Sequence, residues 1–306
     1  MSKILFVLGL ALVASGWLSP PAALVLGIVY GFSFDHPFHQ EARKGSKLLL
    51  QFSVVGLGFG MNLHQVIEAG RAGFVYTAFS IAFALLLGSL LGKILRVKAT
   101  TSYLISAGTA ICGGSAIAAI SPIAEANDEE IAVSLGTVFI LNSIALLLFP
   151  SIGLRLRMSQ TQFGLWSALA IHDTSSVVGA AAKFGALALA VGTTVKLARA
   201  LWIVPLSVGT AVVKKSHAHI QWPWFIFFFL LAAVANTYFR ALQPALPVLK
   251  HLGVLGLTVT LYLIGTGLSM KTIRQVGPRP LLQGILLWIA VAATSLAFIC
   301  SGLIHL

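Results

Sequence analysis

The sequence predicts an all-α membrane protein with about 11 transmembrane segments, and three observations lead to that fold class. Of its 306 residues, 58% are hydrophobic and only 9% are charged, whereas about 25% of the residues in soluble domains are charged. Apolar runs recur at roughly the 20 residues that a helix needs to cross a bilayer. Lys and Arg lie between these runs rather than in clusters, so the net charge of +12 does not indicate a nucleic-acid-binding surface.

The apolar runs follow one another along the whole chain with short polar connections. They lie near 3–18, 20–33, 47–63, 72–92, 100–123, 131–150, 161–183, 186–212, 222–239, 251–269 and 281–303. The second run is short and begins at Pro20. The first run follows Lys3 and ends in small residues, as a signal peptide does, but no clean A-x-A site follows it. We therefore expect residues 1–18 to be retained as a first span.

The distribution of basic residues predicts that the N-terminus lies in the cytoplasm and the C-terminus outside. With that orientation most Lys and Arg, including Lys98 and Arg155, fall in cytoplasmic loops, as the positive-inside rule requires. The remaining loops then carry acidic residues on the outside. These acidic residues are Glu68, Glu125, Asp128, Glu129 and Glu130.

Two glycine frames indicate an internal repeat. GLGFGM at 56–61 and GTGLSM at 265–270 each close an apolar segment, and the predicted topology orients them oppositely. The sequence thus predicts one transporter domain, 1–306, with inverted copies around 47–95 and 251–303. Inverted repeats build secondary transporters whose site lies near the membrane midplane. The alternative is that these small residues serve only close helix packing.

The stretch TAICGGSAI at 109–117 predicts a broken helix within 100–123, because adjacent glycines are poor material for a helix in lipid. Irregular backbone at membrane depth survives only where protein buries it or where it lines a cavity. A second half-helix beginning there would present free amides, which favour an anion. Close packing of a neighbouring helix is the alternative. The candidate substrate contacts are Thr109, Cys112, Gly113, Gly114 and Ser115.

The stretch IHDTSSVVGAAAKFG at 171–185 predicts a second break within 161–185. Asp173 is the acidic residue that falls inside a span, and such residues commonly mark ion or substrate paths. Asp173 also resembles an N-cap, with Thr174 and Ser175 as further substrate contacts. His172 and Asp173 are candidates for charge balance or for binding a coupling ion. In the alternative, Asp173 caps a helix near the surface.

Two basic residues, Lys196 and Arg199, lie on one helical face in the eighth segment. We expect one of them to pair with Asp173 and the other to bind an anion. The alternative is that they extend toward the membrane surface, as we expect of Lys183 near a segment end. Asn142 and Asn62 are polar candidates that serve either a cavity or contacts between helices.

These elements together resemble the YeiH-like family of bacterial inner-membrane sulfate exporters. The resemblance rests on SAGTAICGGSAI at 106–117, on FGLW and IHDTSSVVGAA between 163 and 181, on VKLAR at 195–199 and on GTGL at 265–268. In the family a Gln is common shortly after the histidine and acid, where this chain has Ser175 and Ser176.

The resemblance implies an inner-membrane transporter for sulfate or a small sulfonate. Its discontinuous helices would cross, as in sodium/proton antiporters and bile-acid symporters, and the protein would form a homodimer with a mobile core. We expect it to reside in the lipid bilayer, with a proton or sodium ion as coupling ion and without metal, cofactor or nucleic acid.

The predicted function is alternating-access transport of a small oxyanion, and two alternatives remain. A sodium/proton-type cation antiporter would use Asp173 to coordinate the ion. A membrane-embedded enzyme would use Cys112 as nucleophile with His172 and Asp173 as base and orienter. We expect no enzyme, because adjacent helical residues point about 100° apart and cannot both face one site in a regular helix. Cys112 and Cys300 show neither metal-ligand nor disulfide spacing.

Overall fold

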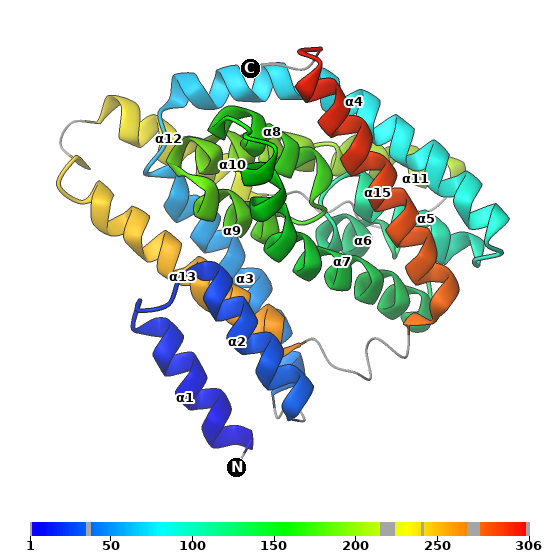
Figure 1. Ribbon diagram of the computed structural model, residues 1–306, viewed down its shortest axis with the longest axis horizontal. Helices are drawn as coiled ribbons and strands as arrows, with labels where there is room; N and C mark the ends of the chain where they lie inside the picture. Colours follow the sequence, from blue (N-terminus) through cyan, green and yellow to red (C-terminus); the bar gives the residue numbers. More distant parts are fainter. Residues whose placement is uncertain (1, 35–37, 215–223, 240–241, 268–275, 304–306) are drawn as a thin grey trace. The chain divides into compact units, whose positions relative to one another are not determined.

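The computed structural model describes residues 2–34, 38–214, 224–239, 242–267 and 276–303, and every regular element in these ranges is a helix. The chain divides into two compact units. The first unit comprises Met1–Ile67 and Pro223–Met270, and the second comprises Glu68–Trp222 and Lys271–Leu306. Figure 1 labels the helices of both units.

The first unit is built on α13 (Leu246–Thr266), which packs along both α2 (Pro20–Ser33) and α3 (His39–Gly58). It also contains α1 (Ser2–Ala14) and α12 (Trp224–Tyr238). A Cβ added to Gly56 would lie 2.7 Å from the Cα of Gly253. One added to Gly265 would lie 2.6 Å from the backbone oxygen of Leu24. Glycine therefore lets these backbones approach closely.

The glycine frames that indicated a repeat thus have a packing role in the first unit, which was the alternative explanation. Residues 268–270 of the second frame lie outside the described residues. The inverted repeat itself stays a prediction. Asn62 caps the start of α4 (Leu63–Ile94), because its Oδ1 accepts a hydrogen bond from the His64 amide at 2.9 Å. Asn62 is therefore a local capping residue.

The second unit contains most of α4 and the helices that carry the candidate site. The longest of these is α7 (Asp128–Arg155), whose 28 residues extend about 42 Å. The remaining helices are α5 (Ala99–Ala110), α6 (Gly114–Ile120), α8 (Gln160–Ala170), α9 (Thr174–Phe184), α10 (Ala186–Ala200), α11 (Ile203–Lys214) and α15 (Pro278–Cys300).

Five stretches in the described part are long and apolar enough to cross a membrane. They are Tyr76–Ile94, Glu129–Arg155, Ala186–Lys214, Leu246–Thr266 and Pro278–Cys300. This supports the predicted all-helical membrane protein. The total number of spans and the side on which the N-terminus lies stay predictions.

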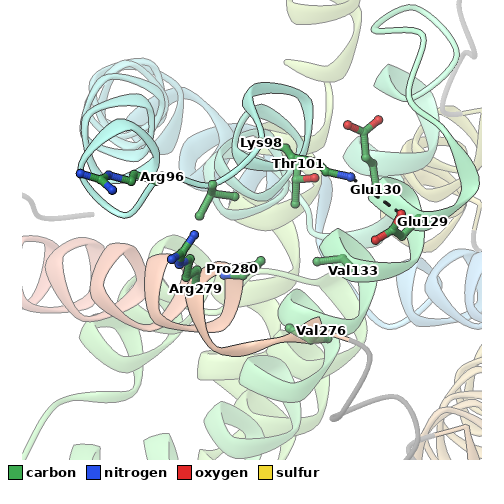
Figure 2. A pocket seen from close by; sticks show the side chains of 10 residues that line it. Arg96, Lys98, Thr101, Glu129, Glu130, Val133, Val276, Arg279 and Pro280 are labelled. Atoms are coloured by element: carbon green, nitrogen blue, oxygen red, sulfur yellow. Dashed lines mark ion pairs between the residues drawn. The ribbon is translucent and has the colours of Figure 1, made fainter.

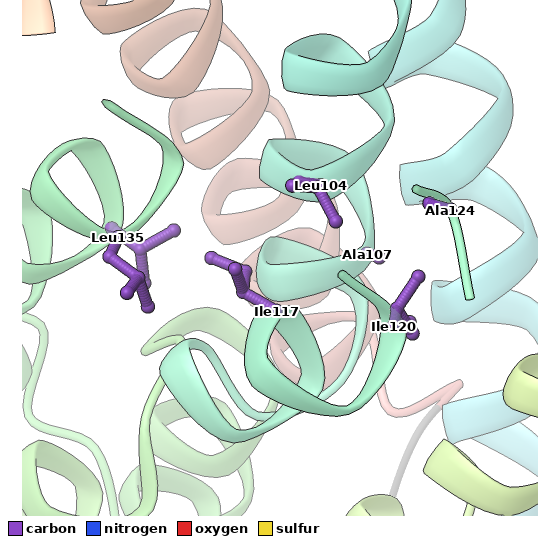
Figure 3. Close-up of a cluster of buried hydrophobic side chains, with 7 residues drawn as sticks. Leu104, Ala107, Ile117, Ile120, Ala124 and Leu135 are labelled. Carbon is purple, nitrogen blue, oxygen red and sulfur yellow. The ribbon is translucent and has the colours of Figure 1, made fainter. Parts of the chain in front are cut away.

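The predicted interruption within 100–123 is confirmed, but the chain folds back there instead of continuing across. A Cβ on Gly108 of α5 would lie 2.9 Å from Cδ1 of Ile117 in α6. Leu104 of α5 shares an apolar cluster with Ile117 and Ile120 of α6, and Figure 3 shows the side chains of this cluster. The arms α5 and α6 therefore form a helical hairpin.

The segment 161–183 is interrupted as predicted, and it also folds back. The rings of Phe163 in α8 and Phe184 in α9 stack with their centroids 3.9 Å apart. The amide of Leu187, just beyond α9, donates to Oε1 of Gln160 at the start of α8 at 3.0 Å. The arms α8 and α9 therefore form a second hairpin.

The two hairpins start from opposite ends of α7. Lys98, before α5, forms an ion pair with Glu129 in the first turn of α7, with Nζ and Oε2 3.8 Å apart. At the other end of α7, a Cβ on Gly153 would lie 2.5 Å from the ring of Phe163. Each hairpin therefore enters the unit from one end and returns to the same end.

The fold-back corrects two predictions. Lys98 was predicted in the cytoplasm and Glu129 outside, yet they lie at the same end of the unit. The interrupted segments were also expected to cross as broken spans, whereas each forms a hairpin. The 12 residues of α5 extend only about 18 Å, short of the roughly 30 Å of hydrocarbon, so a broken segment crosses only if its second arm continues in the same direction, and here it does not. The chain reverses at Gly113, whose φ of 65° and ψ of −125° suit glycine.

Cysteine labelling from one side of the membrane tests the fold-back. In a background lacking Cys112 and Cys300, we expect Lys98→Cys and Glu129→Cys to react with a membrane-impermeant maleimide from the same side. Arg155→Cys should react only from the opposite side, because it lies at the far end of α7. All three positions are exposed. Labelling of Lys98→Cys and Glu129→Cys from opposite sides would contradict the hairpin.

Candidate functional site

The tips of the two hairpins meet beside the middle of α7. A Cβ on Gly113, at the α5–α6 tip, would lie 3.1 Å from Cβ of Asp173, at the α8–α9 tip. The same Cβ would lie 3.2 Å from Val138 of α7. One turn further along α7, Oδ1 of Asn142 accepts a hydrogen bond from the His172 amide at 3.0 Å. The structure thus brings the two predicted breaks together at one place.

Side chains from other helices satisfy the carbonyl groups at the end of α8. Nζ of Lys196 donates to the oxygen of Ile171 at 2.6 Å and to that of Ala168 at 3.3 Å. Nη1 of Arg199 donates to the oxygen of Leu169 at 2.6 Å. The carbonyls at a helix end have no partner in their own helix, and burial makes an unpaired one costly. The two basic residues therefore stabilise a helix end inside the protein.

Trp288 of α15 completes this arrangement and was not predicted as a site residue. Its Nε1 donates to the oxygen of Ala170 at 3.1 Å. Its ring stacks on Phe149 with the centroids 5.8 Å apart. The signal in the sequence was weak: Trp288 lies well inside an apolar run, whereas membrane tryptophans favour the interfaces.

Arg199 also satisfies the end of α5 and so connects the two hairpins. Its Nε donates to the oxygen of Ala110 at 2.6 Å, and its Nη2 lies 3.3 Å from the oxygen of Thr109. Nη1 also lies 3.4 Å from the oxygen of Ala168, and Nη2 lies 3.5 Å from Oγ of Ser80. With the contact to Leu169, the guanidinium makes five hydrogen-bond contacts. A guanidinium has five N–H donors. Arg199 therefore has no donor left over in this arrangement.

The positive charges of Lys196 and Arg199 suit their position for a second reason. Both side chains are completely buried. The end of a helix carries a partial negative charge, so cations beside the last turns of α5 and α8 are favourable. Lys196 has one further donor, because an ammonium has three and two donate to carbonyls. Of the two residues, Lys196 is thus the one with a hydrogen available to a ligand.

Asp173 is the N-cap of α9 and lies inside the unit, as predicted, and the alternative of a cap near the surface is wrong. Its oxygens accept hydrogen bonds from the Ser176 amide at 2.8 Å and from Oγ of Ser175 at 3.0 Å. Only 7% of the residue is exposed. The predicted ion pair with Lys196 or Arg199 is absent, since the ion pair found among the described residues joins Lys98 and Glu129. Asp173 is held by the first turn of its own helix.

Several buried polar atoms at the tips have no hydrogen-bond partner within the described chain. They are both ring nitrogens of His172, Nδ2 of Asn142 and Oγ1 of Thr109. Buried polar groups in native proteins are nearly always paired, with protein, water or ligand. These atoms therefore mark where water or a ligand has partners available.

The other predicted site residues also lie at the tips, with different exposure. Cys112, Gly113, Thr174 and Ser175 are buried, Gly114 is half-buried and Ser115 is exposed. Ser115 is thus the predicted contact with open space beside it.

A surface pocket of about 200 Å³ lies in the same unit, away from the tips. It is lined by Arg96, Lys98, Glu129 and Arg279 among others, and Figure 2 shows the Lys98–Glu129 ion pair at its wall. Lys98 and Thr101 belong to the start of α5, whereas Thr109 belongs to its end. Among the described residues, no group of three or more His, Cys, Asp or Glu is placed to hold a metal ion.

Comparison with known proteins identifies the family. The family described as Conserved hypothetical protein 698 matches residues 6–284. A UPF0324 membrane protein of Bacteroides thetaiotaomicron is 50% identical over 93% of this chain and 87% of its own length. Another, of Porphyromonas gingivalis, is 51% identical over 93% of this chain and 88% of its own. A third, of Bdellovibrio bacteriovorus, is 47% identical over 100% of this chain and 96% of its own. The chain belongs to the UPF0324 family of membrane proteins, the YeiH family that its motifs resemble.

Proposed function

We propose that the protein is a secondary transporter that carries a small oxyanion, sulfate or a sulfonate, across the inner membrane. The observation that carries this proposal is the charge buried where the hairpin tips meet. Lys196 and Arg199 are basic side chains and Asp173 is an acidic one, and all three are buried. With all three ionised the site has a charge of +1, and a bound anion would offset the cost of burying that charge.

The polar groups at the tips supply hydrogen bonds for such an anion. The remaining donor of Lys196 and the Nδ2 donors of Asn142 are available, as is the hydroxyl of Thr109. Arg199 acts through its charge, because its donors already reach carbonyl groups. Charge and donors of this kind suit an oxyanion better than a cation.

The hairpins also suggest a path for alternating access. Each enters the second unit from a different end, and both tips end at the same depth along α7. In carriers, a site near the midplane opens in turn to the two sides. Movement of one hairpin away from the site would open it toward that hairpin's own end.

A sodium/proton-type cation antiporter is the second candidate, and Asp173 is the residue that would serve it. Both of its oxygens already accept hydrogen bonds within α9. Among the described residues, Asp173 belongs to no group of three or more His, Cys, Asp or Glu that could hold a cation. These observations favour the anion.

A membrane enzyme would need a hydrogen bond between the Cys112 thiol and a base. Cys112 and His172 lie on different hairpins, and both ring nitrogens of His172 lack a partner within the described part of the chain. This geometry favours transport over nucleophilic catalysis.

Sulfate uptake into proteoliposomes tests the proposed function. We expect the purified protein to take up radiolabelled sulfate, and Lys196→Gln to slow uptake by about tenfold or more. That variant removes one positive charge while keeping donors for the α8 carbonyls, and a charge a few ångströms away is worth several kcal/mol. Lys183→Gln is the matched control, because Lys183 is an exposed lysine at the end of α9.

Two outcomes would contradict the proposal. If folded Lys196→Gln takes up sulfate like the unmodified protein, the buried lysine has no role in anion transport. If the protein moves sodium against protons and no sulfate or sulfonate, the cation antiporter is the better description.

A further inference from the structure

We infer that the protein carries one proton together with each divalent oxyanion, that His172 holds this proton, and that a monovalent oxyanion travels without one. This inference rests on the proposed function and specifies how the same site handles two classes of substrate. It follows from the charges at the hairpin tips and from the unpaired ring of His172.

The His172 side chain is buried without a hydrogen-bond partner for either ring nitrogen in the described part of the protein. The residue is only 1% exposed. Its backbone is held in place, since the His172 amide donates to Asn142 of α7. A buried ring with two unpaired nitrogens is costly. We therefore expect the ring to gain partners during the transport cycle.

His172 lies among charged residues in the chain and in space. The neighbouring Ile171 carbonyl accepts from Lys196, and Asp173 follows directly in the chain. The elements that meet at the hairpin tips carry further charged and polar groups. They are Lys196 and Arg199 from α10, Asp173 at the start of α9, Cys112 and Thr109 from the other hairpin, Asn142 from α7 and Trp288 from α15.

The charge of the bound anion determines whether a proton on His172 is favourable. With Lys196, Arg199 and Asp173 ionised, the buried site has a charge of +1 without substrate, so a third positive charge on His172 would be repelled by Lys196 and Arg199. A monovalent anion brings the total to zero with a neutral imidazole. A divalent anion brings the total to −1, and one proton on His172 restores zero. Buried sites strongly favour such neutrality.

The proton and the divalent anion thus favour each other's binding. Each offsets the unfavourable charge that the other would leave in the site, which is a reciprocal coupling. Imidazole is the side chain that gains a proton most readily near neutral pH. Sulfate is the divalent probe of this coupling, and methanesulfonate is the monovalent one.

The experiment measures the uptake of each anion, and of protons, by the full-length protein in proteoliposomes that contain a pH-sensitive dye. We expect one proton to enter with each sulfate and none with methanesulfonate. Lowering the pH from about 8 to about 6 should accelerate sulfate uptake and leave methanesulfonate uptake nearly constant. These two measurements need no variant and therefore do not depend on whether a mutant folds.

The variant His172→Gln adds a second test. Glutamine can donate and accept hydrogen bonds but does not take up the proton, so the ratio of sulfate to methanesulfonate uptake should fall about tenfold or more. His251→Gln is the control, because His251 is an exposed histidine of α13. Its ratio should match that of the unmodified protein.

The outcomes separate this inference from the proposed function. If both anions are carried without a proton, or if His172→Gln keeps the ratio, the inference is wrong and anion transport stands. If neither anion is carried, the proposed function fails together with the inference. Equal proton uptake with both anions would also overturn the inference, because the coupling would not depend on substrate charge.

Discussion

Replacing Arg199 with leucine is expected to destabilise the protein more than any other single substitution at the hairpin tips. Its guanidinium donates to the carbonyls of Ala110 and Leu169 at 2.6 Å each, and it is completely buried. Each carbonyl left unpaired inside the protein costs about 1–3 kcal/mol. The two hairpin ends would also lose the positive charge that offsets their partial negative charge.

We therefore expect the apparent melting temperature of Arg199→Leu in detergent to fall by about 10 °C or more. The melting temperature of Arg199→Lys should lie between those of Arg199→Leu and the unmodified protein. An ammonium keeps the positive charge but lacks the planar guanidinium that donates to both hairpins. Arg155→Leu is the control for loss of an arginine, since Arg155 is exposed in the last turn of α7. A melting temperature of Arg199→Leu equal to that of the control would refute the connecting role.

Replacing Gly113 with valine should disrupt the α5–α6 tip. Gly113 has a φ of 65° and a ψ of −125°, a region that residues with a Cβ rarely occupy. An added Cβ would also lie 3.1 Å from Cβ of Asp173 and 3.2 Å from Val138. The backbone strain alone costs about 1–3 kcal/mol, and the contact pushes the two tips apart.

Two measurements check the effect of Gly113→Val. The melting temperature should fall, and protection of the protein against heat by sulfate should be lost because the tips no longer enclose the same space. Gly209→Ala is the matched control, since a Cβ there meets nothing within 4 Å and Gly209 lies inside α11. It should be neutral or stabilising by up to about 1 kcal/mol. Full sulfate protection in Gly113→Val would show that the tip geometry is not needed for binding.

Much of the helical organisation could be predicted, because it depends on local composition. Five of the predicted apolar runs correspond to stretches long and apolar enough to cross a membrane, and Asp173 was recognised as an N-cap from the small and hydroxyl residues that follow it. The adjacent glycines at 113 and 114 marked the end of one helix and the start of another. Such signals act within a few residues and are therefore visible in the sequence.

The direction of the chain after each break could not be predicted. A glycine pair shows that the helix ends, but it does not specify the angle at which the next helix begins. The interrupted segments looked long enough to cross because the residues of both arms were counted together. The torsion angles of Gly113 and the stacking of Phe163 on Phe184 turn each segment into a hairpin.

The partners of the buried cations also depended on the tertiary structure. Lys196 and Arg199 were recognised as intramembrane charges, but a carboxylate was the expected partner. The structure instead places backbone carbonyls of two different hairpins within their reach. Every residue has a carbonyl group, so the sequence contains no sign of which carbonyls will be exposed at an interrupted helix end.

By itself the sequence determined that this is a helical membrane protein, where two of its helices break, and which charged residues are buried, because these properties follow from composition and local backbone preference. Only the tertiary structure decided that both breaks reverse the chain, that their tips meet beside α7, and that Arg199 joins them. The physical reason is that hydrogen bonds between distant segments, and not local preference, determine where an interrupted helix end finds its partners.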